Sequence, residues 1–256
     1  MNRVAALYDI HGNLPALEAV LADVRQAGVD RIVAGGDVVP GPMSRETLHR
    51  LLGLDIPVSF IHGNCEREML ADMAGAEMTT VPPQFRPLMH WSADQLRPDR
   101  DELAAWPPTL RLDVRGIGDV LFCHATPRND VDPFTRLTPE DLLRPLFEPA
   151  RAPLVVCGHT HMQFDRTIGS VRVVNAGSVG MPFQEPGAYW LLLGPDVELR
   201  RTPYDLDAAA ARIRAADYPD AENYAANYVL KPPPEAAMLE AFTKASIKAL
   251  TPVPLG

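Results

Sequence analysis

The feature that most constrains the fold of this chain is a repeated pattern in which a short apolar run ends in a polar side chain. The first run, Val4–Leu7, is followed by Asp9 and His11, and a second run over residues 31–34 leads through two glycines to Asp37. Short apolar runs of this length are typical of buried strands, and an amphipathic stretch typical of a helix separates the two. Alternating strands and helices predict an α/β fold with parallel strands, whose carboxyl ends form the ligand-binding edge of the sheet.

Three later apolar runs end in the same way and complete a set of candidate ligands. The set contains Asp9, His11, Asp37, Asn64, His124, His159 and His161, and it includes four of the seven histidines of the chain. Mixed nitrogen and oxygen ligands without thiolate suit divalent transition metals, for which we expect manganese first and Fe, Zn, Ni or Co as alternatives. Seven ligands are too many for one ion, so the sequence predicts two ions that share a bridging carboxylate.

Composition and charge exclude several classes of protein. The chain has 256 residues, 46% of them hydrophobic and 22% charged, as in an ordinary globular protein. A net charge of −9 argues against a general nucleic-acid binder. No window has the length and hydrophobicity of a membrane span, and the N-terminus does not have the pattern of a signal peptide. Three cysteines form no disulfide framework, so we expect a reducing, cytoplasmic location.

Two segments interrupt or follow the strand pattern. Residues 66–108 contain helical stretches between proline pairs, and we expect them to form a helical excursion near the site. From residue 206 the chain becomes alanine-rich and helical, which predicts one domain over residues 1–205 and a helical C-terminal extension over 206–256. Leu239, Phe242 and Leu250 give the extension an incomplete apolar face. Three roles are open for it: covering the rim of the site, forming a homo-oligomer contact, or capping the sheet.

The ordered motifs of the chain resemble the calcineurin-like metallophosphoesterase superfamily, and its small prokaryotic phosphodiesterase branch in particular. The resemblance rests on Asp9-x-His11, Gly36-Asp37, Gly63-Asn64, His124 and Gly158-His159-x-His161, supported by Asn175-Ala176-Gly177-Ser178-Val179-Gly180. It implies a four-layer αββα sandwich of two mixed sheets with a dinuclear site at the rim. It also apportions the ligands: Asp9, His11 and His161 to one ion, Asn64, His124 and His159 to the other, and Asp37 as the bridge.

This resemblance implies hydrolysis of phosphate esters by attack of a metal-bridging hydroxide, since paired ions lower the pKa of a shared water. Asn13 lies just past the first ligand pair and is expected to contact the phosphate. Arg128 is a further candidate for substrate binding, because its planar guanidinium suits phosphate. We expect a small or nucleotide-type phosphodiester as substrate, with dinucleoside polyphosphates and phosphomonoesters as alternatives.

Cys65 marks a departure from many relatives of this family, which carry a histidine directly after Gly-Asn as the acid for the leaving group. A thiol is a poor acid for this role unless its pKa is shifted. Esters with stabilised leaving groups are then favoured. His62 lies two residues before Asn64, on the same face if the strand continues, and it is a candidate replacement for the missing acid.

Two other functions are possible within the same fold, and the sequence disfavours both. A non-catalytic scaffold for protein contacts is disfavoured because the ligand set is complete. A DNA nuclease is disfavoured by the acidic charge balance and by the lack of a basic stripe.

Overall fold

The structure is a computed structural model that describes residues 1–251, and its strands form two five-stranded mixed sheets. The first sheet has the order β10-β9-β1-β2-β3, in which β1, β2 and β3 run parallel. Its strands are β1 (Val4–Leu7), β2 (Arg31–Ala34), β3 (Val58–Phe60), β9 (Ala188–Leu193) and β10 (Val197–Thr202). The second sheet has the order β4-β5-β6-β8-β7, with β5, β6 and β8 parallel. Its strands are β4 (Thr109–Val114), β5 (Gly118–Cys123), β6 (Leu154–Cys157), β7 (Phe164–Ile168) and β8 (Val171–Asn175).

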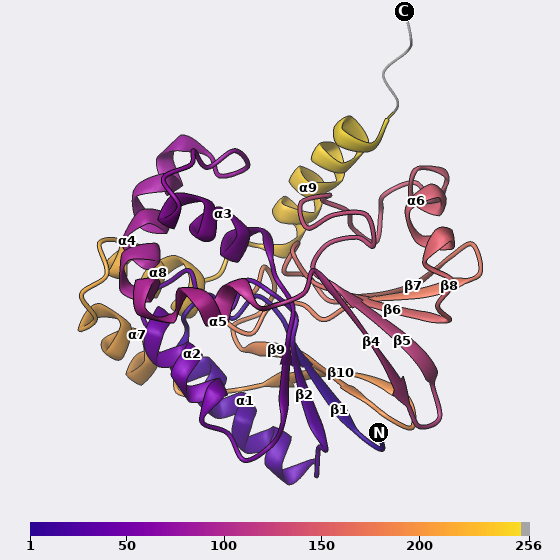
Figure 1. The fold of residues 1–256 in the computed structure, drawn as a ribbon, viewed down its shortest axis with the longest axis horizontal. Coiled ribbons are helices and arrows are strands. Elements are labelled where there is room, and N and C mark those ends of the chain that lie inside the picture. Colours follow the sequence, from indigo (N-terminus) through magenta and orange to yellow (C-terminus); the bar gives the residue numbers. More distant parts are fainter. Residues whose placement is uncertain (252–256) are drawn as a thin grey trace, which may run out of the picture.

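Helices cover the outer faces of both sheets (Figure 1). The α-helices are α1 (Leu14–Gln26), α2 (Ser44–Leu52), α3 (Asn64–Met73), α4 (Arg86–Leu96), α5 (Arg100–Ala104), α6 (Glu140–Phe147), α7 (Leu206–Arg214), α8 (Ala221–Tyr224) and α9 (Glu235–Leu250). A π-helix covers Ala225–Leu230, and short 3-10 helices cover Pro83–Phe85, Arg97–Asp99 and Glu148–Ala150. Helix α6 packs on the second sheet, whereas α1, α2 and α7 share a core with the first.

Strand β1 shows how the layers arise from the alternation of side chains along a strand. Val4 and Ala6 point into the core between the sheets, where they join Phe122 and Val156 of the second sheet. Their neighbour Ala5 belongs instead to the core beneath the helices. Both faces of the strand are therefore buried, which explains its continuous apolar sequence. The expected αββα sandwich is confirmed.

The predicted excursion over 66–108 contains most of α3 and all of α4 and α5, and it shares the core of the first helical layer. The C-terminal extension bridges both halves of the sandwich. Ile213 of α7 packs in the first helical core, whereas the Thr243 hydroxyl of α9 lies 2.7 Å from that of Thr135, on the other half. The division at residue 205 stays a prediction, and residues 252–256 of the predicted extension lie outside the described part. None of the helices within residues 1–251 has the length and hydrophobicity of a membrane span.

Candidate metal centre

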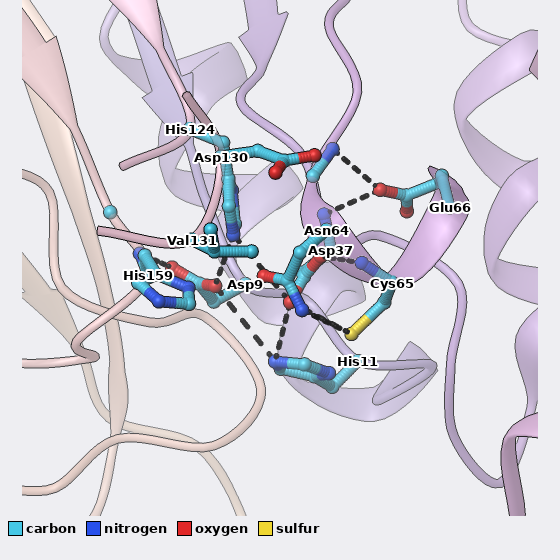
Figure 2. Close-up of polar contacts among 12 residues, drawn as sticks. Asp9, His11, Asp37, Asn64, Cys65, Glu66, His124, Asp130, Val131 and His159 are labelled. Atoms are coloured by element: carbon cyan, nitrogen blue, oxygen red, sulfur yellow. Dashed lines mark hydrogen bonds and ion pairs between the residues drawn. The ribbon is translucent and has the colours of Figure 1, made fainter. Parts of the chain in front are cut away.

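The seven candidate ligands, which we call the ligand cluster, lie where five strands end. Asp9 and His11 follow β1, Asp37 follows β2, and Asn64 begins α3 just after β3. On the second sheet, His124 follows β5, whereas His159 and His161 follow β6. Because the strands within each group are parallel, their carboxyl ends meet at one rim of the sandwich. Figure 2 shows the side chains of Asp9, His11, Asp37, Asn64, His124 and His159 gathered there.

One part of the ligand cluster is formed by Asp9, His11 and His161. The Nε2 atoms of the two imidazoles are 3.2 Å apart, and Asp9 Oδ1 is 3.3 Å from His161 Nε2. Asp9 Oδ1 is also 3.9 Å from His11 Nε2. These three ligand atoms are close enough to coordinate one ion. The grouping coincides with the set expected for the first ion.

The other part of the cluster surrounds His124. Its Nε2 atom lies 3.6 Å from Asp37 Oδ2 and 3.8 Å from Asp9 Oδ1. The His159 ring packs edge-on against the His124 ring at a centroid distance of 5.2 Å. Asp37 Oδ2 is also 3.8 Å from His11 Nε2, so this carboxylate lies between the two groups of ligands. That position suits the predicted bridge.

The backbone of the ligand cluster is strained. Left-handed φ angles between 48° and 67° occur at five of its members, namely Asp9, His11, Asp37, His159 and His161. Such angles are unfavourable for residues other than glycine and concentrate at functional sites. The loops also approach closely, because a Cβ atom on Gly63 would lie 2.1 Å from Asp37 Oδ1. The fold therefore uses conformational strain to turn these side chains toward one point.

Several buried polar atoms of the cluster have no hydrogen-bond partner within the described structure. They are Asp9 Oδ1, Asn64 Oδ1 and His124 Nε2. An unpaired buried polar atom costs about 1–3 kcal/mol, so three at one point indicate a missing partner. The other ring nitrogens are held by carbonyls: His124 Nδ1 lies 3.0 Å from Gly35 O and His161 Nδ1 lies 2.7 Å from Met181 O. Metal-ligating histidines are oriented in this way, and the residues present fit divalent cations.

The electrostatics of the cluster depend on its carboxylates. Burial lowers the pKa of His11 to about 4 and that of His159 to about 4. Burial also acts to lower the pKa of His124, but the nearby Asp37 and Asp9 carboxylates outweigh it and raise the pKa to about 10. In the absence of ions, His124 is therefore a cation at pH 8.

Binding of Mn²⁺ is expected to release at least one proton per protein at pH 8, because a ligating imidazole must be neutral. Higher pH removes the competing proton, so the affinity should rise about tenfold per pH unit for each proton displaced between pH 6 and 8.5. Titration calorimetry in buffers of different ionisation enthalpy measures this release. Binding without proton release would contradict the placement of His124 among the ligands, and His62→Ala, outside the cluster, serves as the control.

Glu66 is a buried acidic residue of the site that the sequence analysis did not single out. Its carboxylate accepts hydrogen bonds from the backbone N–H groups of Asp37 (2.8 Å), Val38 (2.7 Å), Val39 (3.3 Å) and Gly63 (2.8 Å). Burial and the neighbouring Asp37 carboxylate raise the pKa of Glu66 to about 7, so it is ionised at pH 8. Glu66 thus ties the loop after β2 to the loop after β3 (Figure 2). A glutamate in the first turn of a helix was the only sequence signal for this role.

The C-terminal extension reaches the cluster through Tyr224. This buried side chain donates a hydrogen bond from Oη to the carbonyl of His11 at 3.0 Å. The adjoining π-helix is a rare element that is frequent at functional sites. Of the three roles considered for the extension, this contact supports covering the rim of the site.

The Asn175–Gly180 motif also supports the cluster. The Asn175 amide donates hydrogen bonds to Gly158 O at 2.6 Å and to the Thr160 hydroxyl at 3.2 Å. The Ser178 hydroxyl donates to Asp9 O at 2.7 Å. This motif therefore holds the loops after β6 and β1 in place.

Asn13 is held in place by hydrogen bonds within the protein. It is fully buried, its amide oxygen accepts from Ala16 N at 3.2 Å at the start of α1, and its amide nitrogen donates to Gly180 O at 3.0 Å. Both polar atoms are thus used inside the protein. The amide nitrogen carries a second hydrogen, so the role of Asn13 as a phosphate contact stays a prediction.

Cys65 lies inside the cluster and donates a hydrogen bond from Sγ to Asp37 Oδ2 at 3.0 Å. Burial and the Asp37 carboxylate raise the pKa of this thiol well above its usual value. The shift moves Cys65 further from the pKa range of an efficient acid near neutral pH. The thiol is instead a neutral hydrogen-bond donor to the predicted bridging carboxylate.

His62 and Arg128 line a cavity that adjoins His124. His62 Nε2 lies 2.7 Å from the carbonyl oxygen of Leu103. Because a carbonyl can only accept, this nitrogen carries a hydrogen and donates a hydrogen bond to it. Arg128 forms a two-pronged ion pair with Asp132, at 2.9 and 2.8 Å. Both side chains thus have partners within the protein, and their roles as acid and as phosphate ligand stay predictions.

The fold and this rim define the class of protein. A family model described as the calcineurin-like phosphoesterase superfamily domain matches residues 3–194, and the chain belongs to this superfamily. A curated relative, named uncharacterized protein MJ0912 of Methanocaldococcus jannaschii, is 25% identical over 231 residues, which cover 82% of this chain and 91% of the relative.

Two solved structures are similar to this one over most of the chain. The metallophosphoesterase from Sphaerobacter thermophilus is 26% identical with a TM-score of 0.66, and the match covers 89% of this chain and 99% of that one. Hypothetical protein PH1004 from Pyrococcus horikoshii OT3 has a TM-score of 0.76 at 20% identity, covering 91% of this chain and 100% of that one. The second likeness shows that the fold is shared.

Proposed function

We propose that this protein is a metal-dependent phosphodiesterase that holds two divalent transition-metal ions, manganese by preference, in its ligand cluster. The observation that carries the proposal is the convergence of unpaired buried atoms from Asp9, Asn64 and His124 at a rim where His11 and His161 also meet. Membership in the phosphoesterase superfamily agrees with it.

We divide the proposed ligands between the ions as the resemblance to the superfamily implies, and the short distances among Asp9, His11 and His161 agree with the first set. Asp9, His11 and His161 would hold one ion, and Asn64, His124 and His159 the other, with Asp37 shared. When bound, a pair of such ions supplies a hydroxide nucleophile near neutral pH and neutralises charge on the phosphoryl group. The protein holds the imidazoles of His124 and His161 in one tautomer, because their Nδ1 atoms face carbonyl oxygens.

The environment of Cys65 bears on the choice of substrate. Its thiol points at Asp37 and has a raised pKa, so it does not supply a proton readily to a departing alkoxide. We infer that good substrates have leaving groups that are stable as anions. Phosphodiesters of this kind come first, followed by dinucleoside polyphosphates and phosphomonoesters.

The proposal is tested with metal-stripped protein that is refilled with one ion at a time. We expect the stripped protein to be inactive toward bis(4-nitrophenyl) phosphate, and Mn²⁺ to restore turnover more than Zn²⁺ does. A panel of cyclic nucleotides, mononucleotides and diadenosine polyphosphates then ranks the natural classes. Stoichiometric ion binding without turnover of any substrate would contradict the proposal and favour the scaffold alternative.

A further inference from the structure

A cavity of about 400 Å³ opens beside the ligand cluster and reaches it at His11, Asn64 and Cys65. Away from the cluster its walls are apolar and aromatic, and we call it the tyrosine cavity. Its defining wall residues are Phe85, Leu88, Met89, Tyr218, Tyr228 and Met238.

Two separate parts of the chain build the tyrosine cavity. One is the segment around the start of α4, which contributes Phe85, Leu88 and Met89. The other is the C-terminal extension around α8, which lies beside α4 in Figure 1. The two are joined by an edge-on contact between the rings of Trp91 and Tyr218, whose centroids are 5.3 Å apart. Tyr224 anchors the extension to the carbonyl of His11, so the position of this wall is linked to that of the cluster. The wall residues from 218 to 238 lie outside the region matched by the family model.

The charge of the cavity restricts its ligand. None of the residues that line it in the described structure is a lysine or an arginine, and Asp220 adds a carboxylate to the wall. A second phosphate of the substrate would therefore meet a negative charge and no cation on this side. The cavity that adjoins His124 differs, since Arg67 and Arg128 line it, each paired with an aspartate. Charge and apolarity together point to an uncharged, flat group in the tyrosine cavity.

We propose that the tyrosine cavity binds the organic group of the substrate and selects phosphate esters in which this group is aromatic and uncharged. The inference rests on the proposed function, because it places the phosphate at the ligand cluster. Rings stack on or pack edge-to-face against aromatic walls, and both a simple aryl group and a nucleobase have this chemistry. Dinucleoside polyphosphates fit the cavity only if their anionic chain runs toward the other side of the cluster.

The test compares methylphosphonate with phenylphosphonate, which share the metal-binding group and differ in the ring. We expect phenylphosphonate to bind Mn²⁺-loaded protein about 10–100-fold more tightly by titration calorimetry, as burial of a ring implies. The 5′-phosphonate analogue of adenosine monophosphate is a third ligand. A gain for phenylphosphonate alone identifies an aryl ester, whereas a larger gain for the nucleoside analogue identifies a nucleobase.

Variants of the wall make the test specific to this cavity. Phe85→Asn changes a side chain that is already 47% exposed, so folding should be little affected. The double variant Phe85→Asn/Leu88→Asn should bind phenylphosphonate and methylphosphonate with nearly equal affinity. Leu137→Asn replaces an exposed leucine outside the cavity and should leave the ratio as in the unmodified protein.

The outcomes separate this inference from the proposed function. Equal affinity for all three phosphonates would overturn the aromatic specificity while leaving the metal centre intact. A preference for phenylphosphonate that survives the two wall substitutions would also overturn it, because the ring would then bind elsewhere. If no phosphonate binds the metal-loaded protein, the proposed function fails and this inference fails with it.

Discussion

Replacement of Asp37 by asparagine is expected to lower turnover of every phosphodiester by about 10³-fold or more, as loss of a central charge-stabilising group does. The carboxylate of Asp37 lies between His11 and His124, at 3.8 and 3.6 Å from their Nε2 atoms. An amide is neutral and offers one acceptor oxygen, so it cannot bridge two cations as a carboxylate does. Steady-state kinetics and elemental analysis of the Asp37→Asn protein measure the effect, and we expect the metal content to fall as well.

A matched control is available in Asp99, whose carboxylate pairs with Arg45 and His49 outside the ligand cluster. Asp99→Asn should keep both turnover and metal content. Circular dichroism of both variants checks that the fold is retained. Full activity of a correctly folded Asp37→Asn protein would rule out the bridging role.

The second large effect is expected for Glu66→Gln. Each carboxylate oxygen of Glu66 accepts two backbone N–H groups, and an NH₂ group in place of one oxygen would face two donors. Hydrogen bonds to a charged group contribute about 1.5–3 kcal/mol each, so we expect a loss of about 3 kcal/mol in the free energy of unfolding at pH 8. The Tm should fall by roughly 10 °C. Because Glu66 holds the backbone of Asp37, affinity for Mn²⁺ should also fall, by about 10–100-fold.

Glu68 provides the comparison on the same helix. It is also buried and accepts hydrogen bonds from the backbone N–H groups of Thr79 (2.7 Å) and Thr80 (3.1 Å), and within residues 1–251 none of its hydrogen bonds reaches the loop after β2. Glu68→Gln should lower stability without changing Mn²⁺ affinity. If Glu66→Gln and Glu68→Gln change metal affinity equally, Glu66 is an ordinary structural residue. Urea unfolding and calorimetric Mn²⁺ titration, carried out on both variants, separate these results.

Local sequence patterns predicted the central strands but not the two edge strands β7 and β10. Strand β6 is buried along its length and reads as an apolar run. The edge strands β7 and β10 carry arginines and acidic residues, and much of their surface is exposed. An edge strand forms because a neighbour offers hydrogen bonds to it, and that information is not present in its own side chains. Neither of these strands was therefore predicted.

The sequence by itself determined the α/β class, and the order of its polar strand ends identified the residues that meet at the rim. It could do so because parallel strands bring their carboxyl ends together wherever the helices between them lie. Only the tertiary structure revealed Glu66 as the tie between two loops, the internal hydrogen bonds of Asn13, and the contact of Tyr224 with His11. These contacts join residues whose geometry depends on how the layers pack, and packing is a property of the folded chain as a whole.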